Sequence, residues 1–189
     1  YTTLFRSRLE QLKENLPDYA KDIRLNLSNL FGNIESSGLT PTQFYGTALS
    51  IAYSLKNKNL ICALEFESQN AGFSDLYVAA KTAATLMAMN NVYYRAIHLA
   101  ENKELTAMPA NLRMNGLSNH GVDKGDFELF ALAVSAINGC GLCIHSHVKQ
   151  LLGHSVTKVA IQSALRLAAT LNALVTAHAC ADDYLNLEI

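Results

Sequence analysis

The chain has 189 residues, half of them hydrophobic, and its 15 basic and 16 acidic side chains leave a net charge of −1. This length fits one domain with a substantial core, and the hydrophobic content excludes wholesale disorder. The balanced charge argues against nucleic acid as a partner, and the apolar runs are shorter than the roughly 20 residues that span a membrane. Because only 16% of the residues are charged, against a usual value of about 25%, we expect some helix faces to meet another subunit.

The helix signals predict an all-α fold, with a single domain over 1–189. Ala and Leu far outnumber Val and Ile, which favours helix over strand. A break or kink is expected at Asn90 and Asn91, and 107–120 is predicted to be an irregular connection. In chain order, the predicted helices cover about 3–16, 17–32, 40–55, 59–69, 74–89, 92–104, 123–137, 140–152 and 157–184.

Particular residues mark the ends of these helices. Thr40 followed by Pro41 is an N-cap with proline at the first helical position, and Asp123 is the cap of a later helix. Asn138 and Gly139 end that later helix, because glycine readily adopts the left-handed conformation that follows many helices. A new helix is predicted to begin directly afterwards.

An internal repeat is visible at offsets of 83 and 85 residues. Gly38-Leu39-Thr40 followed by Phe44 matches Gly121-Val122-Asp123 followed by Phe127, and Ala83-Ala84-Thr85-Leu86 matches Ala168-Ala169-Thr170-Leu171. Ala-rich helices also produce such matches by chance. If the duplication is real, the halves cover about 38–105 and 121–187, and the chemistry lies in the second half.

The stretch 138–147, Asn-Gly-Cys-Gly-Leu-Cys-Ile-His-Ser-His, is the most informative part of the sequence. A Cys-x-x-Cys motif is typical of a redox dithiol or of half a zinc site, which needs four ligands. At about 100° per residue, Cys140, Cys143 and His147 share one helix face, whereas His145 points away from it. This geometry argues against zinc, and no second Cys-x-x-Cys occurs in the chain.

The redox interpretation has an electrostatic basis. Cys140 is predicted at a helix start, where free N–H groups and the helix dipole favour a thiolate. Cys143 and His147 are neighbours at i and i+4, so the imidazole can accept the thiol proton. We therefore favour Cys143 as the nucleophile and Cys140 as its resolving partner. The alternative is a pair of structural thiols at a tight helix junction.

Glu128 is unusual because the next acidic residue after it is Asp182. It opens a helix that is apolar nearly all round, so its carboxyl is predicted to lie near the core, where it could relay a proton. The residues alone favour the simpler interpretation that Glu128, like Asp126, stabilises the positive end of the helix dipole. His145 lies off the dithiol face and is predicted to be a surface or interface residue.

The other sulfur-containing residues are given ordinary structural roles. Four cysteines are too few for a disulfide scaffold at this length, so a reducing compartment is expected. Cys62 and Cys180 are predicted to be small buried side chains, and Met87 and Met89 are predicted to fill the core. The segment 93–95, Tyr-Tyr-Arg, is ascribed to packing.

Family features run through most of the chain. They include the segments 16–27, 89–95 and 112–115, and the strongest is Glu-x11-Cys-x2-Cys-x3-His from Glu128 to His147. On these motifs the chain resembles the alkyl hydroperoxide reductase AhpD family, within the carboxymuconolactone decarboxylase-like superfamily. This spaced motif is far more specific than a lone Cys-x-x-Cys.

The resemblance implies an all-helical fold with an internal duplication, usually assembled as a homotrimer, and an antioxidant activity in the cytoplasm. It also implies an AhpC-type peroxiredoxin as partner and a weak peroxidase activity of the protein itself. Electrons would come from dihydrolipoamide on a dihydrolipoamide acyltransferase, ultimately from NADH, with no cofactor bound. Cys143 would face peroxide and partner, Cys140 would form the disulfide with it, and Glu128 and His147 would relay protons.

One position departs from the family pattern. Typical members carry a histidine directly before the second cysteine, and this chain has Leu142 there. The help of that histidine is therefore absent or replaced by His145, which affects the expected rate more than the reaction class. Two rival functions remain: a zinc-binding helical interaction module, and a non-redox lactone chemistry that would have no use for a dithiol.

Overall fold

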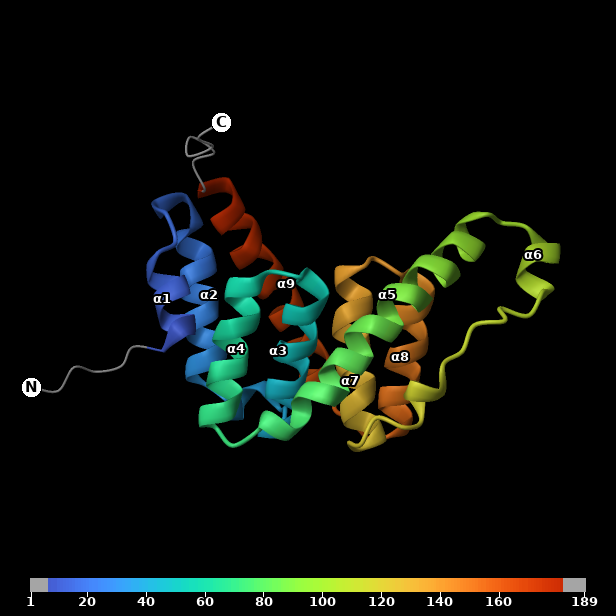
Figure 1. The fold of residues 1–189 in the computed structure, drawn as a ribbon, viewed down its shortest axis with the longest axis horizontal. Coiled ribbons are helices and arrows are strands. Elements are labelled where there is room, and N and C mark those ends of the chain that lie inside the picture. The colour runs from blue at the N-terminus through green and yellow to red at the C-terminus, as the bar shows by residue number, and fades with distance from the viewer. Residues whose placement is uncertain (1–6, 182–189) are drawn as a thin grey trace, which may run out of the picture.

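The computed structural model describes residues 7–181, which form helices and short 3₁₀ turns and no strand (Figure 1). The predicted all-α fold is therefore confirmed for this part of the chain. The helices are α1 Arg8–Glu14, α2 Lys21–Gly32, α3 Pro41–Leu55, α4 Lys58–Asn70, α5 Tyr77–Leu99, α6 Lys103–Ala107, α7 Lys124–Ile137, α8 Gly141–Gly153 and α9 Lys158–Ala181.

The core is built around α7, which packs against α3, α5, α8 and α9. The side chains from Leu129 to Val134 are all fully buried, as the nearly uninterrupted apolar sequence of this helix predicts. Gly46 lets α3 approach α7 closely, because a Cβ at that position would overlap the ring of Phe130. Because α7 carries Glu128, its close packing against α3 helps to hold the site in place.

The predicted helix ends agree with the structure where glycine and capping residues occur. Thr40 and Gln43 form a reciprocal capping box at the start of α3, and the Asp123 carboxylate accepts the Gly125 N–H at 2.8 Å. Gly139 has φ +66° and follows the end of α7. The sequence signals therefore place the turn between α7 and α8 correctly.

The predicted break at Asn90 and Asn91 is wrong, because α5 runs without interruption from Tyr77 to Leu99. Asparagine disfavours helices when its side chain competes for the local backbone. The Asn91 amide instead bonds to Ser135 and Asn138 of the neighbouring α7 region. The helical segment expected over 92–104 ends at Leu99, and α6 is a separate short helix that projects from the body (Figure 1).

The predicted burial of Cys62 and Cys180 is also wrong, since both thiols are free and exposed. Each lies on the outer side of a helix whose other face is buried, in α4 and α9 respectively. The loop expected over 33–39 contains a 3₁₀ turn at Ile34–Ser37. Similarly, Pro17 precedes a 3₁₀ turn, Asp18–Ala20, and α2 starts only at Lys21.

Two predicted helix ends lie outside the described residues. The first helix was expected from Thr3 and the last was expected to reach Tyr184; the described parts begin at Arg8 and end at Ala181. By length and composition alone, α9 could cross a membrane, but half of its most apolar window is buried. Its contacts with α2, α3 and α7 are those of a core helix.

The order of helices recurs along the chain. A long helix, a shorter helix and a second long helix occur as α3, α4 and α5, and again as α7, α8 and α9. The first helices of the two sets meet, since Gln43 Nε2 donates to Asp126 Oδ1 at 2.8 Å and these residues are 83 positions apart. This recurrence supports the predicted duplication of 38–105 and 121–187, and the duplication itself stays a prediction.

Candidate active site

The turn between α7 and α8 brings Cys140 and Cys143 together. Cys140 is the N-cap of α8, and its sulfur accepts the Cys143 N–H at 3.3 Å. The Cys140 N–H in turn donates to the Ser135 carbonyl at 3.1 Å, which ties the turn to the last part of α7. The two cysteines form a disulfide across a Cα–Cα distance of 5.3 Å.

The two sulfur-bearing residues differ in their access to solvent. Cys140 is fully buried, whereas 7% of Cys143 is exposed, and the neighbouring Leu142 is 42% exposed. Both cysteines are therefore shielded, and Cys143 is the less shielded of the two. The capping contact, by contrast, places the Cys140 sulfur at the positive end of the helix dipole, which favours a thiolate there.

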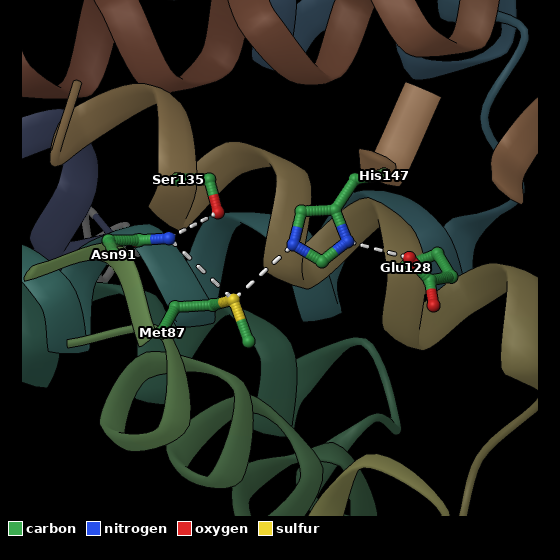
Figure 2. A network of polar contacts seen from close by, with 5 residues as sticks. All are labelled: Met87, Asn91, Glu128, Ser135 and His147. Atoms are coloured by element: carbon green, nitrogen blue, oxygen red, sulfur yellow. Dashed lines mark hydrogen bonds and ion pairs between the residues drawn. The ribbon is translucent and has the colours of Figure 1, made fainter. Parts of the chain in front are cut away.

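Glu128 and His147 form a close pair, with His147 about one helical turn after Cys143 on α8. Glu128 Oε2 lies 2.7 Å from His147 Nδ1, and the two side chains are only 15% and 13% exposed. Figure 2 shows the carboxylate from α7 and the imidazole from α8 pointing at each other. Because solvent screens this pair poorly, their interaction is stronger than that of a surface pair. The predicted juxtaposition of these residues is thus present.

Met87 occupies the other side of the same imidazole. It is buried, as predicted for a core residue, but its Sδ also lies 3.3 Å from His147 Nε2 (Figure 2). With both ring nitrogens protonated, His147 donates to Glu128 and to Met87 at once, the thioether being a weak acceptor. No sequence spacing could have linked Met87 to His147, since the two lie 60 residues apart on different helices.

A buried hydrogen-bond network joins α5 to the turn that carries the cysteines. Asn91 Nδ2 donates to Ser135 Oγ at 2.9 Å, and Asn91 Oδ1 accepts from Asn138 Nδ2 at 3.0 Å. Arg95 Nη1 donates to the carbonyl of Asn138. Asn91 is fully buried, so its amide is held on both sides. The sequence predicted only a packing role for Arg95 and did not predict its hydrogen bond to Asn138.

His145 is exposed on α8, as its position off the dithiol face predicts. Two residues along a helix correspond to about 200°, so its side chain leaves α8 on the side opposite His147. This geometry does not support the expectation that His145 replaces the missing family histidine. Position 142, in the first turn of α8, is closer to Cys143 along the chain.

His120 and Asp126 carry the resolved pKa shifts near the site. The His120 ring stacks on Phe127 with centroids 4.1 Å apart, and burial lowers the pKa of His120, opposed by the charges of Glu128 and Asp123. Burial raises the pKa of Asp126, opposed by the hydrogen bond from Gln43. His120 precedes α7, and Asp126 lies in its first turn, two residues before Glu128.

The described residues do not form a metal site. Among residues 7–181, no group of three or more His, Cys, Asp or Glu side chains lies close enough together to hold a metal ion. Cys140 and Cys143 are bonded to each other, and both ring nitrogens of His147 have other contacts. The arrangement is that of a disulfide that caps α8, with a carboxylate–imidazole pair about one helical turn further along the helix.

An all-helical chain with a cysteine pair at a helix start has the features of a thiol–disulfide protein. Sequence comparison identifies the family within this class. Residues 103–182 match the model of the carboxymuconolactone decarboxylase family. Proteins named alkyl hydroperoxide reductase AhpD are 49% identical in Rhodopseudomonas palustris BisB18, 50% in a Bradyrhizobium species and 48% in Maricaulis maris. The alignments cover 88–89% of this chain and 90–94% of those proteins. The chain belongs to the alkyl hydroperoxide reductase AhpD family.

Proposed function

We propose that the protein is an antioxidant thiol–disulfide oxidoreductase that reduces alkyl hydroperoxides with the Cys140/Cys143 dithiol. The observation that carries this proposal is a redox-competent cysteine pair at the start of α8, with the shielded Glu128–His147 pair about one helical turn further along that helix. The names of the relatives support the same reaction class. Metal binding would require ligands that the described residues do not bring together.

The first step takes place at Cys143, the more accessible sulfur. Its thiolate attacks the terminal oxygen of the hydroperoxide and the O–O bond breaks, giving a sulfenic acid and, with one proton, an alcohol. The imidazole of His147 supplies that proton and Glu128 stabilises the imidazolium before it does so. A group within hydrogen-bond reach of a carboxylate is suited to this acid–base work.

The second step closes the disulfide. The Cys140 thiol attacks the sulfenic sulfur of Cys143, a water molecule leaves, and the S–S bond forms. Cys140 is suited to this step because its sulfur accepts the Cys143 N–H at the start of α8, where thiolate character is favoured. A dithiol donor then returns two electrons and two protons through a mixed disulfide at Cys143.

We assign the donor and partners by relation to the family. Dihydrolipoamide carried by a dihydrolipoamide acyltransferase is the proposed reductant, with NADH as the ultimate source of electrons. An AhpC-type peroxiredoxin is the proposed electron acceptor besides hydroperoxide itself. The proposed working form is a cytoplasmic homotrimer, for which light scattering should give about three times the chain mass of 20.6 kDa.

The test is hydroperoxide consumption driven by dihydrolipoamide with the purified chain and its single-cysteine variants. Cys143→Ser should abolish turnover and should form no mixed disulfide. Cys140→Ser should also stop turnover, but should still trap a partner thiol at Cys143, because only resolution is lost. Cys62→Ser is the matched control, since Cys62 is a free, exposed thiol on α4. Full turnover by Cys143→Ser would refute the proposal.

A further inference from the structure

Three residues of α5 contact different parts of the site from one helix face. Met87, Asn91 and Arg95 follow each other at intervals of four, so they lie in one row along the helix. We propose that this row, here called the α5 row, positions the disulfide turn and the His147 ring and thereby sets the redox equilibrium and the reactivity of the dithiol. In this proposal α5 is the helix that supports the site. Only the biological use of the dithiol rests on the proposed function.

The central contact is made by Asn91. Its amide bonds to Ser135 on one side and to Asn138 on the other. Ser135 accepts the backbone N–H of Cys140, so the network reaches the first cysteine through one residue. Because Asn91 is fully buried, its removal would leave the buried Ser135 hydroxyl and the half-buried Asn138 amide without their partner, each at a free-energy cost. The Asn91 amide therefore helps to hold the turn in position.

Arg95 supports the same turn from the outside. Its guanidinium donates to the carbonyl of Asn138, the residue that ends α7. That carbonyl is one of the last of the helix, which lack partners within the helix and carry partial negative charge. A cation there is favourable, and it holds the residue two positions before Cys140. Arg95 is exposed, so it can be replaced without opening the core.

Met87 acts on the second half of the site. Its Sδ faces His147 Nε2, while Glu128 faces Nδ1. The ring is therefore held at both nitrogens (Figure 2), which fixes its orientation between α7 and α5. Replacing the thioether with a hydrocarbon of similar volume would remove the acceptor from Nε2 and leave the packing nearly unchanged.

The contacts of the α5 row affect the reduction of the Cys140–Cys143 disulfide. Reduction of the Cys140–Cys143 bond takes two electrons and two protons and gives two thiols, while dithiothreitol is oxidised to its cyclic disulfide. A turn held in place keeps the two thiols close and favours the disulfide. Loosening the turn lowers the effective concentration of one thiol at the other, so the disulfide should become easier to reduce.

The experiment measures the thiol–disulfide equilibrium of the full chain in dithiothreitol redox buffers, with alkylation to trap the thiols. We expect Asn91→Ala to weaken the disulfide about tenfold, which corresponds to about 30 mV for a two-electron couple. Arg95→Ala should weaken it about threefold, and Arg95→Lys, which keeps a donor and the charge, should restore the wild-type value. Thr85→Ala is the control, because this exposed residue lies on α5 and its hydroxyl donates to Lys81 within the same helix.

Met87→Leu separates positioning from a general loss of structure. We expect its thiol–disulfide equilibrium to stay within twofold of wild type, while alkylation of Cys143 at neutral pH slows about threefold and its pH profile moves upward. Both chains carry Cys62→Ser and Cys180→Ser, because those exposed thiols would also be alkylated. Comparing the pH profiles of Cys140→Ser with and without Met87→Leu in this background isolates Cys143.

Unchanged equilibria in Arg95→Ala and in a folded Asn91→Ala, together with an unchanged pH profile in Met87→Leu, would overturn the proposal. If Asn91→Ala does not fold, Arg95→Ala decides the first part. These measurements involve no peroxide, so a chain without peroxidase activity would refute the proposed function and leave this inference to be judged by its own results.

Discussion

The site depends on how single residues are shielded and oriented. Cys143 has slight exposure and Cys140 has none, which agrees with the predicted division between attacking and resolving sulfur. Glu128 touches His147 at 2.7 Å, a contact that helix-dipole stabilisation alone would not require. The roles themselves stay predictions, and two replacements test them at this scale.

Replacing Glu128 distinguishes a proton relay from simple stabilisation of the helix start. Glu128→Gln keeps an oxygen near His147 but removes the charge, so we expect peroxidase turnover near neutral pH to fall about tenfold or more. Asp126→Asn is the matched control, because Asp126 is an acidic residue two positions before Glu128 on α7 and accepts from Gln43 instead. Equal losses of turnover in both variants would favour the dipole interpretation.

Leu142 offers a gain of function. It is 42% exposed directly before Cys143, at the position where the family usually has a histidine. We expect Leu142→His to increase turnover several-fold near neutral pH, because an added imidazole beside the thiol can exchange protons with it. Leu152→His, also on α8 and 47% exposed, controls for the added histidine and should leave turnover unchanged. A rate for Leu142→His no higher than wild type would contradict this expectation.

At the scale of helices, the sequence predicted elements well where local chemistry decides their limits. Thr40, Asp123 and Gly139 end or begin helices through contacts within a few residues, so their signals are readable in the chain. The predicted break at Asn91 was wrong because the Asn91 amide bonds to Ser135 and Asn138 of the α7 region. No local sequence pattern reveals such a contact. Met87 was placed in the core correctly, but its contact with His147 arises only from the packing of α5 against α8.

The crossing of α3 and α7 is open to a stability test. An alanine at Gly46 would place its methyl group against the ring of Phe130, so Gly46→Ala should lower the free energy of unfolding by about 1–3 kcal/mol. Gly32→Ala is the same substitution where no atom lies within 4 Å, and it should raise that free energy by up to about 1 kcal/mol. Urea unfolding of both variants makes the comparison. A Gly46→Ala variant as stable as wild type would show that the helices can separate without cost.

For the whole molecule, the low charge content and the exposed apolar side chains point in the same direction. Val78, Val92 and Leu99 of α5 are 72%, 60% and 70% exposed, which accords with the sequence-based expectation that helix faces meet another subunit. The all-α class followed from composition and caps, since those are local and additive. The assembly depends on surfaces that one chain leaves uncovered, so its symmetry stays a prediction.

His120 contributes to the dependence of global stability on pH. Burial lowers the pKa of His120 below its usual value of 6.5, and its Nδ1 accepts the Val122 N–H at 3.4 Å, a bond that protonation removes. Between the two pKa values the unfolded chain binds more protons than the folded one, so stability rises with pH across this window and is lost as the pH falls through it.

His120→Phe keeps a ring on Phe127 but cannot titrate, so it should lose less stability than wild type between pH 7.5 and 5. The free energy of unfolding in urea, measured at both pH values, gives this difference, and other titrating groups cancel from it, including Asp126 with its raised pKa. His145→Phe removes an exposed histidine of α8 and should show the same loss as wild type. If His120→Phe loses as much stability as wild type on acidification, the neutral, buried form of His120 is not what the fold prefers, and the stacking on Phe127 does not oppose its protonation.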